Sequence, residues 1–143
     1  MRGFELVSNV EGGKIPERGS KASAGYDISI ITGATIAPGE VKVFNTGVKA
    51  YMNDDEFLSL HVRSSVGIKM GLILANITGI IDSDYYNNES NEGHIMVALH
   101  NISNKEVVVE DGMRVCQGIF TKYLTVANDA SDKTRVGGIG STN

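Results

Sequence analysis

The chain has 143 residues, the length of one ordinary domain, and a net charge of −4. Hydrophobic residues make up 41% and charged residues 21%, a balance typical of a soluble globular protein. The sequence has no Lys or Arg run suited to a nucleic-acid backbone and no apolar segment long enough to span a bilayer, so we expect neither nucleic acid nor membrane as a partner.

Short β-branched or aromatic runs recur along the chain, and helical periodicity is nearly absent. The runs that predict strands are residues 4–10, 41–45, 56–62, 95–100, 107–109 and 113–123. In the third run, Leu58 and Leu60 share one face, while Ser59 and His61 share the other. Turn signals lie at residues 12–13, 38–39, 53–55 and 111–112. Many short strands at close spacing predict an all-β sandwich or barrel.

One short helix is predicted after the third run. Ser64 or Ser65 would cap its N-terminus, and Gly71 would end it. From residue 128 onward the sequence is polar and then glycine-rich, so it has little to bury. We therefore expect a β-barrel domain over residues 1–127 and a flexible glycine-rich tail over residues 128–143.

The single cysteine, Cys116, excludes an intrachain disulfide, and the first residues lack the apolar stretch of a signal peptide. Both features indicate a cytoplasmic protein. The three histidines show no spacing typical of zinc ligands, and no GxSxG nucleophile motif is present. These patterns exclude zinc-dependent and serine-nucleophile hydrolysis from our expectations.

Two stretches in the first half carry residues suited to metal or phosphate chemistry. AGYDI at residues 24–28 offers Asp27 to a hard cation such as Mg²⁺, which prefers oxygen ligands and keeps several waters. A plain turn entering a strand is the alternative. Arg63 supplies a bidentate donor just before the predicted helix, whose first amides attract anions. Simple capping by Ser64 is the equal alternative there.

Three further stretches are GIIDSDY at residues 79–85, GMRVCQ at residues 112–117 and the tail from Arg135. Asp82 and Asp84 would lie on one side of an extended segment, and a surface turn is the alternative. A calcium loop is excluded, because residues 87 and 93 are Asn and Gly where that loop needs Gly and Glu. The tail glycines would let backbone amides approach a phosphate, although a frayed terminus fits equally.

The order of these stretches is more specific than any one of them. AGYDI, RSS, GIIDSDY, GMRVCQ and a glycine tail from Arg to GST resemble the five ordered motifs of the trimeric dUTPase family, in its Gram-positive bacterial or phage form. The resemblance implies a distorted jelly-roll-like β-barrel with at most one short helix, assembled as a homotrimer with shared active sites. It also implies hydrolysis of dUTP to dUMP and pyrophosphate by Mg²⁺-assisted water attack at the α-phosphorus. That activity keeps uracil out of DNA and supplies dUMP for dTMP synthesis.

The same resemblance assigns roles to individual residues. Asp82 would activate the attacking water, and Asp27 would hold Mg²⁺ through water. The residues expected to contact dUTP are Arg63, Ser64, Ser65, Asn76, Gly79, Ile81, Tyr85, His94, Gln117, Arg135, Ile139, Gly140, Ser141 and Thr142. Asn76 and the segment after it would read uracil, and Tyr85 would pack under the deoxyribose. The tail, through Arg135, would close over the triphosphate and complete the active site.

The chain departs from the family pattern in places that affect this lid. Val62 stands where Pro is usual, and Ile139 replaces the Phe that usually covers the uracil ring. Residues 86–92 form an insertion where most members are shorter. Because Tyr86 and His94 bound that insertion, we expect one of these rings to cover uracil instead, His94 first. The alternative is that both rings lie on a solvated loop.

Two other functions remain open at this point. A dCTP deaminase shares the fold, but it lacks the glycine tail and uses a Glu on the later strand, where residues 95–100 have none. A phage regulatory protein could bind a partner through residues 86–92, and this role is compatible with enzyme activity.

Overall fold

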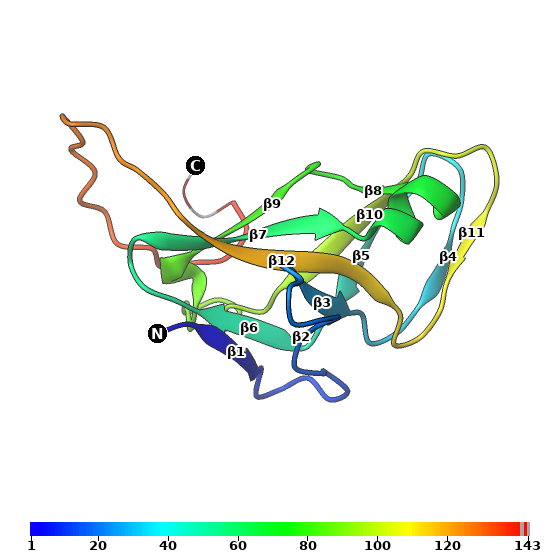
Figure 1. The fold of residues 1–143 in the computed structure, drawn as a ribbon, viewed down its shortest axis with the longest axis horizontal. Helices are drawn as coiled ribbons and strands as arrows, with labels where there is room; N and C mark the ends of the chain where they lie inside the picture. The colour runs from blue at the N-terminus through cyan, green and yellow to red at the C-terminus, as the bar shows by residue number, and fades with distance from the viewer. Residues whose placement is uncertain (141, 143) are drawn as a thin grey trace.

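The computed structural model describes residues 1–140 and 142, and it is nearly all β (Figure 1). Its strands are β1 (Gly3–Leu6), β2 (Glu17–Arg18), β3 (Tyr26–Ser29), β4 (Ala34–Ile36), β5 (Val41–Asn45), β6 (Val48–Tyr51), β7 (Glu56–Val62), β8 (Leu72–Leu74), β9 (Gly79–Asp82), β10 (Met96–Asn101), β11 (Val107–Val109) and β12 (Arg114–Lys122). The largest sheet has the order β2-β3-β12-β7-β9. A second sheet is β5-β10-β8, and the pairs β1-β6 and β4-β11 complete the barrel.

The observed strands confirm the predicted all-β, jelly-roll-like class. Residues 41–45, 56–62 and 107–109 are strands with the predicted bounds. The first strand is shorter than predicted and ends at Leu6, because the amide of Ser8 donates to the carboxylate of Glu92 instead of continuing a ladder. The predicted turns at Gly39 and Gly112 have φ of +79° and +72°, which favour glycine.

Alternate residues of β7 divide between the core and the other face of the sheet, as predicted. Leu58 and Leu60 are buried in the core cluster. Ser59, on the other face, is also buried, and its hydroxyl donates to the Ile119 carbonyl at 3.2 Å. The largest fully buried side chains come from several sheets and include Ile28, Ile30, Ile36, Leu58, Leu72, Ile95 and Leu99.

The predicted short helix is a single π-helical turn, Ser65–Lys69, which Gly71 follows with a φ of +70°. Ser64 precedes the turn, but its side chain makes no capping hydrogen bond, because its own backbone is already helical. A 3₁₀ turn, Ser83–Tyr85, follows β9 and adds a second turn to the one that the sequence predicted. No helix in the described part of the chain is both long and apolar enough to cross a membrane.

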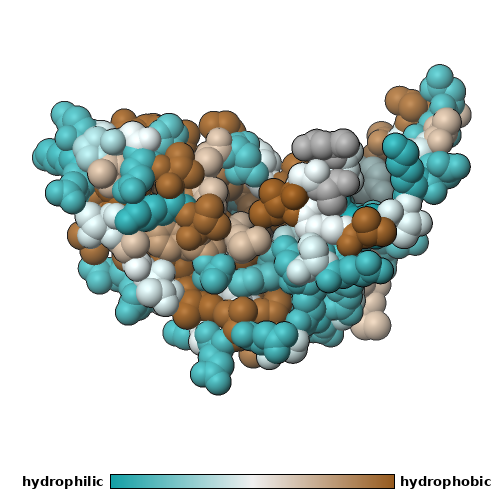
Figure 2. Space-filling model, turned by 180° about the vertical axis from the view of Figure 1, so that it is seen from behind, coloured by the Kyte–Doolittle hydropathy of each residue, from teal (hydrophilic) through white to brown (hydrophobic). Residues whose placement is uncertain are grey.

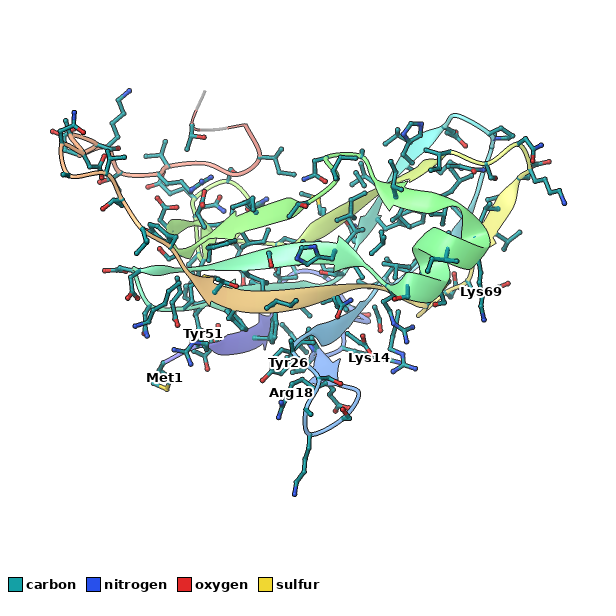
Figure 3. All side chains as sticks on the ribbon, turned by 45° about the horizontal axis from the view of Figure 1, so that its top comes forward. Met1, Lys14, Arg18, Tyr26, Tyr51 and Lys69 are labelled. Carbon is teal, nitrogen blue, oxygen red and sulfur yellow. The ribbon has the colours of Figure 1, made fainter. Side chains whose placement is uncertain are left out.

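An aromatic cluster joins β1 to the largest sheet. The rings of Phe4, Tyr26 and Phe120 pack with centroids 5.3 to 6.2 Å apart. Arg18 lies over the Tyr26 ring at 5.9 Å, and Figure 3 shows the two side chains beside each other below β12. These contacts tie β1 to β3 and β12, the two strands on which Asp27 and Gln117 lie.

After β12 the chain leaves the barrel as an arm and then returns towards β9. The arm runs from orange to red in Figure 1 and stands out at the upper right of Figure 2. Within the described residues, the arm from residue 123 onward contains no strand or helix. Its return point is fixed by Arg135, which binds Asp82 and Asp84. The predicted flexibility of the tail stays a prediction.

Candidate functional site

The predicted site residues gather in two places, and the first surrounds Asp27 on β3. In the ladder, Asp27 lies opposite Gln117 of β12. Arg63, directly after β7, brings its Nε to 3.4 Å from one carboxylate oxygen of Asp27. Arg114 brings Nη1 to 3.3 Å from the other oxygen. We call Asp27, Arg63, Arg114 and Gln117 the Asp27 cluster.

A glycine and the first residues of the π-helical turn complete this cluster. A Cβ atom on Gly25 would overlap the Gln117 side chain, so the AGYDI motif needs glycine at this position. Ser64 and Ser65 are exposed next to Arg63. Two guanidiniums therefore contact one carboxylate, with Gln117 opposite it and two exposed serines next to Arg63 in the chain, an arrangement suited to a phosphate chain.

Sequence reasoning missed Arg114 because a bulge turns it towards Asp27. In a regular strand, residues three apart point to opposite faces. The ladder shifts by one residue between Arg114 and Cys116, so Arg114 pairs with Ser29 and Gln117 with Asp27. Arg114 and Gln117 consequently share a face. No residue pattern in the GMRVCQ motif predicts the bulge.

The Asp27 carboxylate suits a magnesium ion that arrives with a polyphosphate, and the two guanidiniums beside it suit the phosphates. The described residues contain no group of three or more His, Cys, Asp or Glu that could hold a metal. Asp27 is 17% exposed, so its carboxylate can be reached from solvent. Mg²⁺ is commonly held by one or two carboxylates together with waters and phosphates. The residues present fit that arrangement and do not fit an all-protein cage.

The second place is a cavity of about 470 Å³ beside β9. The predicted site residues that line it are Asn76, Gly79, Ile81, Asp82, Tyr85, Arg135, Ile139, Gly140 and Thr142. Gly79 lies so close to β7 that a Cβ atom would be 2.9 Å from the Leu60 Cβ. The backbone of β9 therefore forms a wall of the cavity. Ser141, also predicted to contact dUTP, lies outside the described residues.

Arg135 joins the tail to both acidic residues of the GIIDSDY motif. Its Nη2 lies 2.8 Å from an Asp82 oxygen, and its Nε lies 2.8 Å from an Asp84 oxygen. Its guanidinium also lies 5.7 Å from the centre of the Tyr85 ring. The two carboxylates face the same side, as expected, although Asp84 is in a 3₁₀ turn instead of an extended segment.

Tyr85 is buried at the floor of the cavity, with 6% of its surface exposed. Its hydroxyl donates to the His94 carbonyl at 2.8 Å and accepts from Asn91 Nδ2 at 2.9 Å. Burial raises the pKa of the phenol, so the ring stays neutral and fully protonated at physiological pH. The ring is held at its polar end and presents an apolar face to a ligand.

The structure does not place the His94 or Tyr86 ring at the cavity, and the identity of the residue that covers the base stays a prediction. His94 is buried, and its Nε2 accepts a hydrogen bond from the Gly47 amide at 2.9 Å. Burial also lowers the pKa of His94. Tyr86 donates to Glu5 at 2.6 Å. Both rings form hydrogen bonds with residues of the barrel, and neither lines the cavity, whereas Ile139 does.

The Asp27 cluster and the cavity are far apart within one chain. Gln117 is opposite both Asp27 and His61, while Asp82 is opposite Phe57. Three strand steps and four residues along β7 then separate Asp27 from Asp82, about 14 Å across the sheet and about 13 Å along it. A general base must lie within hydrogen-bond reach of the water that it activates. The two carboxylates of one chain therefore cannot serve the same phosphorus atom.

Comparison with known proteins gives a consistent picture. The family model described as dUTPase matches residues 11–143. The chain is 46% identical to the deoxyuridine 5'-triphosphate nucleotidohydrolase of Lactococcus lactis, over 99% of this chain and 97% of that protein. The crystal structure of the dUTPase from Streptococcus mutans is similar with a TM-score of 0.82 and 42% identity, over 88% of this chain and 99% of that one. A dUTPase from phage phi11 of S. aureus shares the fold with a TM-score of 0.77 at 21% identity, over 93% and 97% of the two chains.

Proposed function

The chain belongs to the dUTPase family, and on that premise we propose that it hydrolyses dUTP to dUMP and pyrophosphate. The observation that carries this proposal is the cavity, in which Asp82, Tyr85 and Arg135 come together beside the backbone of β9. A dCTP deaminase is less well supported, because β10 carries no Glu and the glycine tail is present. Cytoplasmic hydrolysis of dUTP would keep uracil out of DNA and supply dUMP for dTMP synthesis.

In this proposal the base and sugar occupy the cavity. Asn76 and the β9 backbone from Gly79 to Ile81 would bind the uracil edge. Cytosine would leave a buried polar group unpaired there, which costs about 1–3 kcal/mol. Tyr85 would pack under the deoxyribose, and Ile139 would cover the ring from the tail side.

The chemical step needs a positioned water, a base and compensation of charge. Asp82 would accept the proton of the water as its oxygen attacks the α-phosphorus and the bond to the pyrophosphate oxygen breaks. Triphosphate oxygens would compete with Asp82 for Arg135, which releases the carboxylate for this role. Arg63, Ser64, Ser65 and Gln117 would contact the phosphates, while Gly140, Ser141 and Thr142 would follow Arg135 over them.

A bound Mg²⁺ would offset phosphate charge and orient the triphosphate. Asp27 would hold it through water. Arg63 and Arg114, which pair with Asp27 at 3.3 to 3.4 Å, would then turn towards phosphate oxygens.

The proposed assembly is a homotrimer with shared sites, and the separation of Asp27 and Asp82 within one chain supports sharing between subunits. The Asp27 cluster of one subunit would meet the cavity of another. Val43 and Ile80, which line the cavity, are 63% and 55% exposed in the single chain, and a neighbouring subunit would cover such apolar surface. Sedimentation should give the mass of a trimer, and a fully active monomer would contradict the shared site.

A nucleotide panel tests the reaction itself. We expect pyrophosphate release from dUTP, with little from UTP, dCTP or dTTP, and no ammonia from dCTP. Asp82→Asn should lower kcat on the order of 10²-fold or more, because it removes the general base. Asp84→Asn is the matched control, since Asp84 pairs with the same guanidinium but lies outside the cavity lining. Near-normal turnover by Asp82→Asn would show that this role is misassigned.

A further inference from the structure

The insertion, residues 86–92, is built around the buried amide of Asn88. The Oδ1 of Asn88 accepts from the backbone amides of Ser90 and Asn91, at 3.0 and 3.2 Å. Its Nδ2 donates to the Tyr85 carbonyl at 2.8 Å. Asn side chains commonly close turns in this way. The insertion is consequently folded onto the residue that precedes it.

These contacts also fix the orientation of the Asn91 amide. Because Oδ1 of Asn88 faces two N–H donors, its other end must be Nδ2, which donates to Oδ1 of Asn91 at 2.7 Å. The Gly93 amide donates to the same Asn91 oxygen at 3.1 Å. Nδ2 of Asn91 must therefore be the atom that faces the Tyr85 hydroxyl at 2.9 Å. The phenol accepts from Asn91 and is left to donate to the His94 carbonyl.

The backbone closes the insertion tightly against Tyr85. The Asn87 amide donates to the Glu92 carbonyl at 2.9 Å, and both residues have positive φ, 57° and 65°. Gly93 follows with a φ of 88°, and a Cβ atom there would lie 2.8 Å from the Tyr85 carbonyl oxygen. Only glycine allows the chain to return so near to Tyr85.

Lys49 of β6 ties the insertion to the barrel from outside. Its side chain is largely buried, and its Nζ donates to Asn87 Oδ1 at 2.6 Å and to Glu92 Oε2 at 2.7 Å. The Ser8 amide also donates to Glu92 Oε2, at 3.1 Å. Charge-assisted bonds of this kind are stronger than neutral ones. The insertion is therefore anchored at both ends and turned inward.

We propose that Asn91 is a positioning residue that holds Tyr85 at the angle required to reject a ribonucleotide. The inference rests on the proposed function, in which Tyr85 packs under the deoxyribose. A phenol held between Asn91 and the His94 carbonyl cannot swing away from the sugar. Displacements of about 1 Å can decide whether a bound ligand fits productively. Without the Asn91 bond, the ring gains freedom and a 2′-hydroxyl finds room.

The tail glycine Gly138 lies against the same amide. A Cβ atom on Gly138 would be 2.8 Å from Asn91 Nδ2 and 3.1 Å from the Ser90 hydroxyl. Asn91 thus stands between the sugar-binding ring and the segment that covers the cavity. A change at Asn91 acts on both through one side chain.

A double-mutant cycle tests whether Asn91 acts through the Tyr85 hydroxyl. The proteins are wild type, Asn91→Ala, Tyr85→Phe and the double variant, and kcat/KM is measured for dUTP and UTP with each. Asn91→Ala should lower the ratio of dUTP to UTP about five- to ten-fold, the worth of one neutral hydrogen bond. In the Tyr85→Phe background, the same substitution should change the ratio no further. Additive effects, or an unchanged ratio in Asn91→Ala, overturn the proposal.

Two further variants separate positioning from folding. Asn91→Asp keeps an oxygen for Asn88 and Gly93 but places an acceptor beside the phenol, whose single proton cannot serve both this carboxylate and the His94 carbonyl. The ring therefore loses one of its two hydrogen bonds, and a reduced ratio at an unchanged Tm is expected. A wild-type ratio in Asn91→Asp overturns the proposal even if Asn91→Ala fails to fold. Glu89→Gln, at an exposed position of the same insertion, is the matched control and should retain the wild-type ratio. Wild-type protein that leaves dUTP intact would instead refute the proposed function.

Discussion

The insertion and the tail both border Tyr85, both are polar, and neither contributes a strand in the described residues, yet they are held in different ways. The insertion is fixed by neutral amides that bond to backbone atoms, with Asn88 at its centre. The tail is fixed by the guanidinium of Arg135, which pairs with two half-exposed carboxylates. The insertion thus holds Tyr85, which lines the cavity, through neutral contacts, while the tail lines the same cavity and is held through ion pairs.

The difference lies in whether the substrate can compete for the contact. A triphosphate offers strong acceptors to a guanidinium, so it can replace Asp82 and Asp84 as partners of Arg135. In each pair the Arg135 side chain is 8% exposed and the carboxylate is 52% or 56% exposed, so a triphosphate can approach the contact from the carboxylate side. The substrate would not compete in the same way for the neutral amide hydrogen bonds inside the insertion. Ion pairs with half-exposed carboxylates suit a part that moves during a catalytic cycle, whereas neutral amides and the more buried Lys49–Glu92 pair suit a part that must stay.

Deletion of residues 135–143 should have the largest effect, a loss of activity with little loss of stability. It removes Arg135 from the triphosphate, so we expect kcat to fall on the order of 10²-fold or more, as for loss of a phosphate-binding arginine. The described residues of the tail supply nothing to the core cluster, so the Tm should barely change. Pyrophosphate release and circular dichroism melting measure the two quantities. A shortened chain that still turns over dUTP well, or melts far below wild type, would show that the tail has another role.

Substitutions of Gly93, directly after the insertion, and of Gly138, in the tail, test whether the two regions differ in their contribution to stability. Gly93→Ala forces a side chain into a φ of 88° and against the Tyr85 carbonyl, so the free energy of unfolding should fall by about 1–3 kcal/mol. Gly138→Ala should leave that free energy unchanged and raise KM for dUTP, since its Cβ would meet the Asn91 amide. Denaturant titration and steady-state kinetics distinguish them. Equal losses of stability would mean that both segments are structural.

Low pH should weaken the Lys49–Glu92 contact that anchors the insertion, and we expect this effect on stability to be the smallest of those predicted. The hydrogen bond from Lys49, with those from Ser8, lowers the pKa of Glu92 from 4.5 to about 2. A carboxyl whose pKa is depressed by folding stabilises the protein above pH about 4.5 and loses that contribution as the pH falls towards 2. The difference in Tm between wild type and Glu92→Gln should shrink over this range. A difference that stays constant from pH 6 to pH 2 would exclude a role for the charge.

Sequence patterns predicted the elements whose signals are local. The longer alternating strand β7 and the turns at Gly39 and Gly112 needed no tertiary information. Strands β2, β4, β6, β8 and β9 were missed, because two to four residues are too few to establish a period. The motifs indicated most of the candidate site through family resemblance, although the roles of its residues stay proposals.

What the sequence could not provide was set by geometry. Arg114 reaches Asp27 only because of a bulge, which depends on pairing between β12 and β3. His94 was expected over the base, but its ring binds the Gly47 amide, and no local pattern distinguishes a buried ring from a stacking one. The Asn-rich letters of the insertion did signal side chain to backbone hydrogen bonds, and that signal could have identified Asn88.

Cys116 can report transient opening of the central sheet through its reactivity. It lies on the central strand β12, opposite Ile28 of β3 and Val62 of β7, with none of its surface exposed. Burial raises the pKa of its thiol to about 12, so the reactive thiolate is scarce while the sheet is closed. Because the chain has no other cysteine, the rate of alkylation by a small thiol reagent measures how often the central sheet opens.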